Sequence, residues 1–249
     1  MLTAFVSCGS NSGSNPDDES DESEYIFELI PEAVMYAEIL NAYQDFLYND
    51  ENKDNQIMSV DITVNNLYER IAKELNIDKD QRNYELWVSC TEMRDGNLGY
   101  AIHDINNDGI DELIILSEGD FNIHAIYSLD KDVPILIGGY WSRYRCVIDE
   151  KGTLFIHASG GAGDWYSASY RILQGSKELQ LIEMYGHETY DDQTGKSFLS
   201  GQYYRIKNDN KSIIEEEEFM VAIEHFPDVN SSAPTKKAGL HFISFLAKD

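Results

Sequence analysis

The spacing of apolar residues changes near Gly99, and this change constrains the fold more than any other feature of the chain. Before Gly99, apolar residues recur at intervals of three and four positions, as in helices with one buried face. After Gly99, short runs rich in β-branched and aromatic residues follow one another, as in strands. The sequence therefore predicts a single α+β domain over residues 25–249, with a helical part over 25–97 and a mainly β part over 98–249.

Two amphipathic helices are expected before Gly99. The first begins at about Tyr36, with Pro31 nearby at a position that a helix tolerates. Its apolar stripe consists of Ile39, Leu40, Tyr43, Phe46 and Leu47. After the polar stretch 49–56, the stripe of the second helix consists of Leu67, Tyr68, Ile71, Ala72 and Leu75. We interpret both stripes as core.

The strand-like runs beyond Gly99 are joined by short polar connections rich in Gly and Asp, the turn chemistry of β-hairpins. The runs cover residues 100–105, 113–116, 122–129, 135–148, 153–158, 166–173, 179–185 and 202–206. This spacing predicts an antiparallel meander. A final helix is expected over residues 215–226, because Ser212 and Glu215 have capping-box spacing and acidic residues fill its first turn.

Residues 2–9, LTAFVSCG, place a small residue before Cys8 and resemble the end of a bacterial lipoprotein signal. The resemblance implies that Cys8 is diacylated. Phe5 stands where leucine is usual, and no basic or long apolar run precedes Cys8, so we expect the signal to begin upstream. Residues 9–24 pass from Gly, Ser and Asn into acidic residues, the composition of a flexible tether. The alternative is a frayed tail with an incidental cysteine.

The chain has 45 acidic and 19 basic residues and a formal net charge of −26. This charge repels phosphate backbones, so nucleic acid is not expected as a partner. It attracts cations and thereby favours a metal site. No apolar run approaches the ~18 residues of a membrane-spanning helix. We expect the domain to lie outside the cytoplasm, held at the cell membrane by the lipid anchor on Cys8.

Residues 104–112, DINNDGIDE, have the D-x-N-x-D-G-x-x-E spacing of a calcium-binding loop. Calcium takes six to eight oxygen ligands, and alternate residues of a tight loop can converge on one ion when a glycine permits the turn. Gly109 supplies that turn, and Asp111 is expected to face solvent. The expected Ca²⁺ ligands are the side chains of Asp104, Asn106, Asp108 and Glu112 and the backbone carbonyl of Ile110.

The alternative for this loop is a turn that needs no ion, since Asp and Asn favour turns. It leaves the repulsion among Asp104, Asp108 and Glu112 unexplained. An EF-hand is excluded, because position twelve is Ile115 and the flanks are strand-like. The loop between strands resembles the calcium loops of integrin-like FG-GAP and VCBS repeats, which implies the ion and its ligands. The motif occurs once, so a propeller is not expected, and the ion is expected to clamp two strands.

The Gly-rich segment 159–166, SGGAGDWY, joins a carboxylate to two aromatic side chains, which is the chemistry of sugar recognition. Asp164, Trp165 and Tyr166 are therefore candidate ligand-binding residues. The alternative is an ordinary hairpin or bulge. Similarly, residues 140–145, YWSRYR, form either an aromatic and cationic contact strip or simple cross-strand packing.

The sequence as a whole is similar to surface lipoproteins of gut Firmicutes, and this resemblance implies no activity. Our leading interpretation is a calcium-stabilised surface lipoprotein that binds a glycan or an envelope protein. The alternatives are a polysaccharide hydrolase with paired carboxylates and a structural accessory subunit. An enzyme is not favoured, because G-x-S-x-G, H-E-x-x-H and phosphate-binding loops are absent from the sequence. Cys90 and Cys146 could form a disulfide or remain buried thiols.

Overall fold

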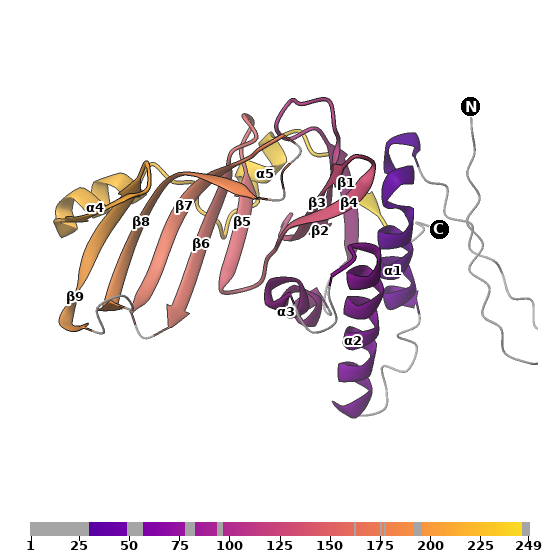
Figure 1. Ribbon diagram of the computed structural model, residues 1–249, viewed down its shortest axis with the longest axis horizontal. Coiled ribbons are helices and arrows are strands. Elements are labelled where there is room, and N and C mark those ends of the chain that lie inside the picture. Colours follow the sequence, from indigo (N-terminus) through magenta and orange to yellow (C-terminus); the bar gives the residue numbers. More distant parts are fainter. Residues whose placement is uncertain are drawn as a thin grey trace, which may run out of the picture.

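The computed structural model describes residues 30–48, 57–77, 83–93, 97–161, 163–174, 176, 178–191 and 196–245 (Figure 1). It contains two antiparallel sheets and a few helices, so the predicted α+β class is confirmed. Most of the helices precede the sheets along the chain, also as predicted. Cys8 and the expected linker 9–24 lie outside the described residues.

The N-terminal helices pack against one face of the first sheet (Figure 1). A 3-10 helix, η1 (Pro31–Tyr36), has its proline in the first turn and leads into α1 (Ala37–Tyr48). The second predicted stripe lies on α2 (Ile57–Glu74). The residues of both stripes are buried, apart from Leu47 and Leu75, which are partly buried against the same core. The prediction that both stripes form core is therefore confirmed.

A third helix, α3 (Tyr84–Glu92), is not indicated by the sequence pattern. Its apolar face is short, and a serine, Ser89, occupies one of its buried positions. That serine is accommodated because its hydroxyl donates to the backbone oxygen of His124 at 2.6 Å. The Asn83 side chain begins the helix as its N-cap, accepting a hydrogen bond from the backbone N–H three residues later at 2.9 Å.

The first sheet has five strands in the order β11-β1-β2-β3-β4. Its strands are β1 (Leu98–His103), β2 (Glu112–Ser117), β3 (Ile123–Asp130), β4 (Val133–Gly139) and β11 (Ile243–Ser244). The last strand returns from the end of the described chain and pairs with Gly99 and Tyr100. It thereby ties the C-terminal segment to the strand that precedes the predicted calcium loop.

The second sheet has six strands in the order β10-β9-β8-β7-β6-β5 and extends away from α1 and α2 (Figure 1). Its strands are β5 (Tyr144–Ile148), β6 (Leu154–Gly161), β7 (Asp164–Ile172), β8 (Leu179–Asp191), β9 (Lys196–Lys207) and β10 (Asn210–Ile214). All neighbouring strands in it are antiparallel and consecutive along the chain.

The prediction of one meandering sheet is wrong, because the chain changes sheets inside the run 135–148, which was expected to be one strand. That run contains most of β4 and all of β5, separated by residues 140–143. Gly139 makes the crossing possible: a Cβ there would lie 2.8 Å from backbone atoms of Glu85 in α3. The chain can pass this close to the helix only without a side chain.

Two hydrophobic cores result from this arrangement. The helix-side core lies between the N-terminal helices and the first sheet, and in it the hydroxyl oxygens of Tyr43 and Tyr127 are 2.8 Å apart. The inter-sheet core joins the other face of the first sheet to the second sheet. Cys90 belongs to the helix-side core and Cys146 to the inter-sheet core, and both are free thiols. Of the two alternatives, buried thiols are therefore the ones observed.

The C-terminal segment contains the short helices α4 (Glu216–Ile223) and α5 (Ala233–Lys237). The predicted helix over 215–226 is thus present in shorter form, but its capping box is wrong. Ser212 lies in β10, paired with β9, and the N-cap Glu215 makes no side-chain capping bond. No helix in the described part of the chain is long and apolar enough to cross a membrane.

Candidate functional site

The predicted calcium loop connects β1 to β2, which pair along their whole length and end opposite each other at His103 and Glu112. The strand-loop-strand setting expected from the sequence is therefore confirmed. Two loop residues have left-handed backbone conformations, Asn107 with a φ of 58° and Gly109 with a φ of 87°. Asn and Gly adopt this region more readily than other residues, so the sequence is suited to a sharp turn at these positions.

Hydrogen bonds from backbone N–H groups hold the loop carboxylates on the inner side of the turn. Asp104 accepts from Asp108 N–H at 3.0 Å and from Gly109 N–H at 2.9 Å. Asp108 accepts from Ile110 N–H at 2.8 Å, and Asn106 Oδ1 accepts from Asp108 N–H at 3.0 Å. The side chains at positions one, three and five of the motif are therefore tied to one compact turn.

Glu112 closes the loop from inside the protein and is 0% exposed. Its Oε2 accepts from Ile105 N–H at 2.8 Å, and its Oε1 accepts from the Ser128 hydroxyl at 3.0 Å. The pKa of this carboxyl is raised to about 7, chiefly by burial and also by the nearby charges of Asp108 and Asp104, while the two hydrogen bonds oppose the shift. A carboxylate in this position is stabilised by a proton or by a neighbouring cation.

The loop also contacts the N-terminal helices. The Tyr36 hydroxyl at the end of η1 donates to the backbone oxygen of Asp111 at 2.8 Å. The Asp111 residue is partly exposed, and its side chain is not among the hydrogen-bonded carboxylates described above. The loop thus contacts both the first sheet and the N-terminal helices. A change in its conformation would therefore alter the contacts with both.

The loop does not gather three carboxylates around a common point. Within the described ranges, no three His, Cys, Asp or Glu side chains are close enough to share a metal ion. The expected calcium set includes three carboxylates, Asp104, Asp108 and Glu112, and the described structure does not present them around one point. An amide oxygen of Asn106 and a backbone oxygen of Ile110 are the other expected ligands. Each carboxylate oxygen retains a free lone pair after accepting one hydrogen bond, so the donor chemistry of the loop fits calcium.

The structure does not bring the three candidate ligand-binding residues together. Asp164 accepts from the N–H and the hydroxyl of Thr189 at 2.6 and 2.7 Å, which lowers the pKa of its carboxyl. Trp165 packs edge-on against Phe219 of α4, with ring centroids 5.0 Å apart. Tyr166 points to the opposite face of the sheet, because successive residues of a strand alternate in direction. The alternation therefore separates Trp165 from Asp164 and Tyr166, which share the other face of the sheet.

Tyr166 instead shares its face with Tyr144 of the candidate strip 140–145, and with Tyr170 and Tyr204, which the sequence analysis did not select. Tyr144 and Tyr166 both pair with Ala158, and Tyr166 and Tyr204 both pair with Gly186, so the three lie in one row across the sheet. Tyr170 lies four residues after Tyr166 in β7, on the same face. The spacing of Tyr166 and Tyr170 is a sequence signal for one face, whereas the row across strands follows only from the register.

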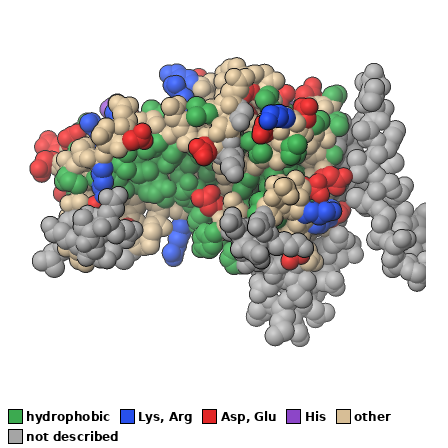
Figure 2. All heavy atoms as spheres, viewed as in Figure 1, with side chains coloured by type: hydrophobic (Ala, Val, Ile, Leu, Met, Phe, Trp, Pro, Cys, Tyr) green, Lys and Arg blue, Asp and Glu red, His purple; other side chains and the backbone are tan. Residues whose placement is uncertain are grey.

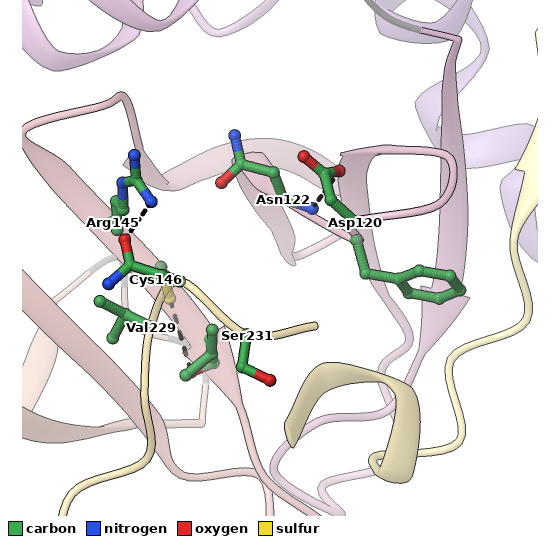
Figure 3. A pocket seen from close by; sticks show the side chains of 9 residues that line it. Asp120, Asn122, Arg145, Cys146, Val229 and Ser231 are labelled. Carbon is green, nitrogen blue, oxygen red and sulfur yellow. Dashed lines mark hydrogen bonds between the residues drawn. The ribbon is translucent and has the colours of Figure 1, made fainter. Parts of the chain in front are cut away.

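A small hollow of about 90 Å³ lies where β5 meets the connection between α4 and α5 (Figure 3). In it, Arg145 donates from Nε to the backbone oxygen of Ser142 at 3.0 Å and from Nη1 to Asn230. Asp120 is the only carboxylate among its lining residues. The hollow therefore lacks the carboxylate pair that the hydrolase alternative requires.

Comparisons with known proteins do not assign a family. No protein-family model matches the chain, and the search of curated proteins gave no significant match. One solved structure is similar, described as "Structure of a Xanthomonas Type IV Secretion System related protein". It is 15% identical, with a TM-score of 0.25, and the match covers 46% of this chain and 57% of that chain. A similarity at this TM-score carries no argument about this protein.

Proposed function

We propose that this protein is a lipid-anchored domain on the outside of the cell membrane, which binds calcium at residues 104–112 and a glycan or protein ligand on its surface. Calcium has a structural role in this proposal. It holds the β1–β2 connection in place and does not contact the ligand.

The observation that carries the calcium proposal is the buried carboxyl of Glu112 at the end of an acidic loop. Its pKa is raised to about 7 by burial and by Asp104 and Asp108, so charge is unfavourable there without a partner. The ion pairs among the described residues all involve other carboxylates. A calcium ion at the loop supplies the positive charge that these three carboxylates lack.

Two arguments, the calcium affinity of such loops and the lipoprotein-like residues 2–9, connect the calcium proposal to a location outside the cell. Extracellular calcium modules have dissociation constants of about 0.1 to 1 mM, which match the calcium concentrations found there. The resemblance of residues 2–9 to a lipoprotein signal supports a location of the domain in that compartment. The lipid anchor and the metal site are therefore consistent with each other, although each is inferred from a separate part of the sequence.

Thermal unfolding tests the calcium proposal. The melting temperature should rise on addition of millimolar calcium and fall on addition of EDTA, because a ligand that binds only the folded state stabilises it. An Asp108→Ala variant should lose this response, whereas Asp111→Asn, which removes a neighbouring charge outside the ligand set, should keep it. Identical melting with calcium and EDTA would rule out the site.

A further inference from the structure

One face of the second sheet is covered by the α4 segment, and the other packs in part against the inter-sheet core and is otherwise open. On the covered face, Phe219 of α4 lies 4.7 Å from Tyr203 between ring centroids, and Phe226 packs edge-on against Phe155 and Tyr185. The segment that follows α4 passes behind the sheet in the view of Figure 1. Among the described residues, no helix lies over β6 to β8 on the viewed face, and hydrophobic side chains gather there (Figure 2). The register assigns the tyrosines to this second face, where Tyr144, Tyr166 and Tyr170 pack against the inter-sheet core and stay partly exposed.

We name the open part of this face the tyrosine face and define it by Tyr144, Tyr166, Tyr170 and Tyr204, all partly exposed. Burial raises the pKa of Tyr144, Tyr170 and Tyr204, and the Tyr166 hydroxyl adds to each shift, so Tyr166 lies among the other three. Gly186 explains the position of the Tyr204 ring. A Cβ at Gly186 would lie 2.4 Å from the end of the Tyr204 ring, so that ring lies across the glycine.

The tyrosine face already holds one cation, Lys211 of β10. The Lys211 ammonium lies 4.4 Å from the centroid of the Tyr204 ring and 2.6 Å from Glu188 Oε2. A tyrosine ring and a carboxylate thus hold a lysine between them, an arrangement in which the attraction to the ring adds to the ion pair. This contact shows which ligand chemistry the face accommodates.

A second carboxylate, that of Glu85, acts on the rings of the tyrosine face. Glu85 of α3 is exposed, and its charge adds to the burial that raises the pKa of Tyr144, Tyr166 and Tyr170. Partial desolvation also raises the pKa of Glu85 itself. Within the part of the chain that the structure describes, no Lys or Arg forms an ion pair with Glu85. A carboxylate next to tyrosine rings is therefore available to a cation from another molecule.

We propose that the tyrosine face docks a basic segment of a partner protein, with a Lys or Arg side chain on the tyrosine rings and in contact with Glu85. This inference rests on the proposed ligand-binding role and chooses the protein ligand over the glycan. Charge complementarity selects the partner. The chain carries a net charge of −26, which opposes docking of a second copy or of an anionic membrane on this face.

A fluorescein-labelled octa-arginine peptide is a suitable probe, measured by fluorescence anisotropy at 150 mM salt so that long-range attraction is screened. We expect Glu85→Gln and Tyr170→Ala each to weaken binding by about threefold or more. Two matched controls should leave it unchanged: Glu217→Gln, which removes one charge from α4 across the sheet, and Leu173→Ala, which removes an exposed apolar side chain beyond β7. Melting curves verify that all four variants are folded.

Three results would overturn the inference. Equal weakening by Glu85→Gln and Glu217→Gln would mean that the peptide senses only the overall charge. Absence of peptide binding while the calcium response is intact would exclude a basic segment on this face. Binding of the neutral sugars cellohexaose or chitohexaose that depends on Tyr170, without peptide binding, would identify a glycan site instead. In that last case the proposed ligand-binding function stands and only the partner class is wrong.

Discussion

Glu112 Oε2 accepts a hydrogen bond from the backbone N–H of Ile105 at 2.8 Å. This bond joins the last residue of the acidic loop 104–112 to its second residue. The carboxyl that makes this bond is fully buried and has a pKa of about 7. Its charge near neutral pH therefore depends on its surroundings, and a proton and a cation compete for the same role. This competition leads to the first prediction.

Without calcium, raising the pH should destabilise the protein through Glu112. The pKa of its carboxyl is raised from 4.5 to about 7, so the folded state binds the proton more tightly than the unfolded state. The stabilisation is complete below the unfolded pKa and is lost as the pH rises through the folded pKa. It amounts to something on the order of 3 kcal/mol for a shift of this size.

The measurement is denaturant unfolding in EDTA over about pH 4.5 to 8, for the wild type and for Glu112→Gln, which cannot titrate at this position. The free energy of unfolding of the wild type relative to the variant should fall as the pH rises. A difference that stays constant with pH would contradict the prediction. In excess calcium, the fall should be smaller, because the cation replaces the proton.

Tyr36→Phe should lower the free energy of unfolding by about 1 kcal/mol, since it removes the hydrogen bond to the backbone oxygen of Asp111. The ring remains in the helix-side core, so the effect isolates the hydroxyl. Denaturant unfolding measures it, with Tyr84→Phe as the control, because Tyr84 is 64% exposed. Equal stability of the two variants would mean that the contact between η1 and the loop contributes nothing.

Gly139→Ala should destabilise the fold by about 1 to 3 kcal/mol, the range typical of overpacking. The new Cβ would lie 2.8 Å from the backbone of Glu85, so either α3 or β4 must shift. Gly160→Ala is the matched control, because its Cβ would meet its nearest neighbour at an ordinary 3.5 Å. If the two variants unfold alike, the close passage of β4 beneath α3 is not a constraint on the fold.

Lipidation at Cys8 can be checked by intact mass spectrometry of the protein extracted from membranes of its native host. We expect the mature chain to begin at Cys8 with a diacylglyceryl group attached. A Cys8→Ser variant should be found in the soluble fraction. An unmodified chain that continues upstream of Cys8 would exclude the anchor.

Local patterns were sufficient to predict much of the fold. The stripes at Ile39 and Ile71 repeat at helical intervals, and their residues are buried. The prediction of one strand over the run 135–148 is wrong because the run includes Gly138, Gly139 and the polar pair Ser142–Arg143, where the chain crosses between the sheets. Pairing of Ile243 with Tyr100 joins segments far apart in the chain, and no local pattern encodes such a contact.

The same distinction applies to the candidate sites. The predicted calcium loop is contiguous, so its spacing alone predicts the observed turn, in which Asp104 and Asp108 accept hydrogen bonds from backbone N–H groups. The tyrosine face draws Tyr144, Tyr166 and Tyr204 from three different strands, and their alignment depends on register shifts at bulges. Trp165 illustrates the resulting error, since its place beside Tyr166 in sequence puts it on the opposite face of the sheet.

Calorimetric titration of the metal-free protein with calcium tests the central claim most directly. We predict one binding site with a dissociation constant of about 0.1 to 1 mM. The site should be absent in Asp108→Ala and retained in Asp111→Asn. Absence of calcium binding to the wild type, or equal binding to all three proteins, would contradict the account.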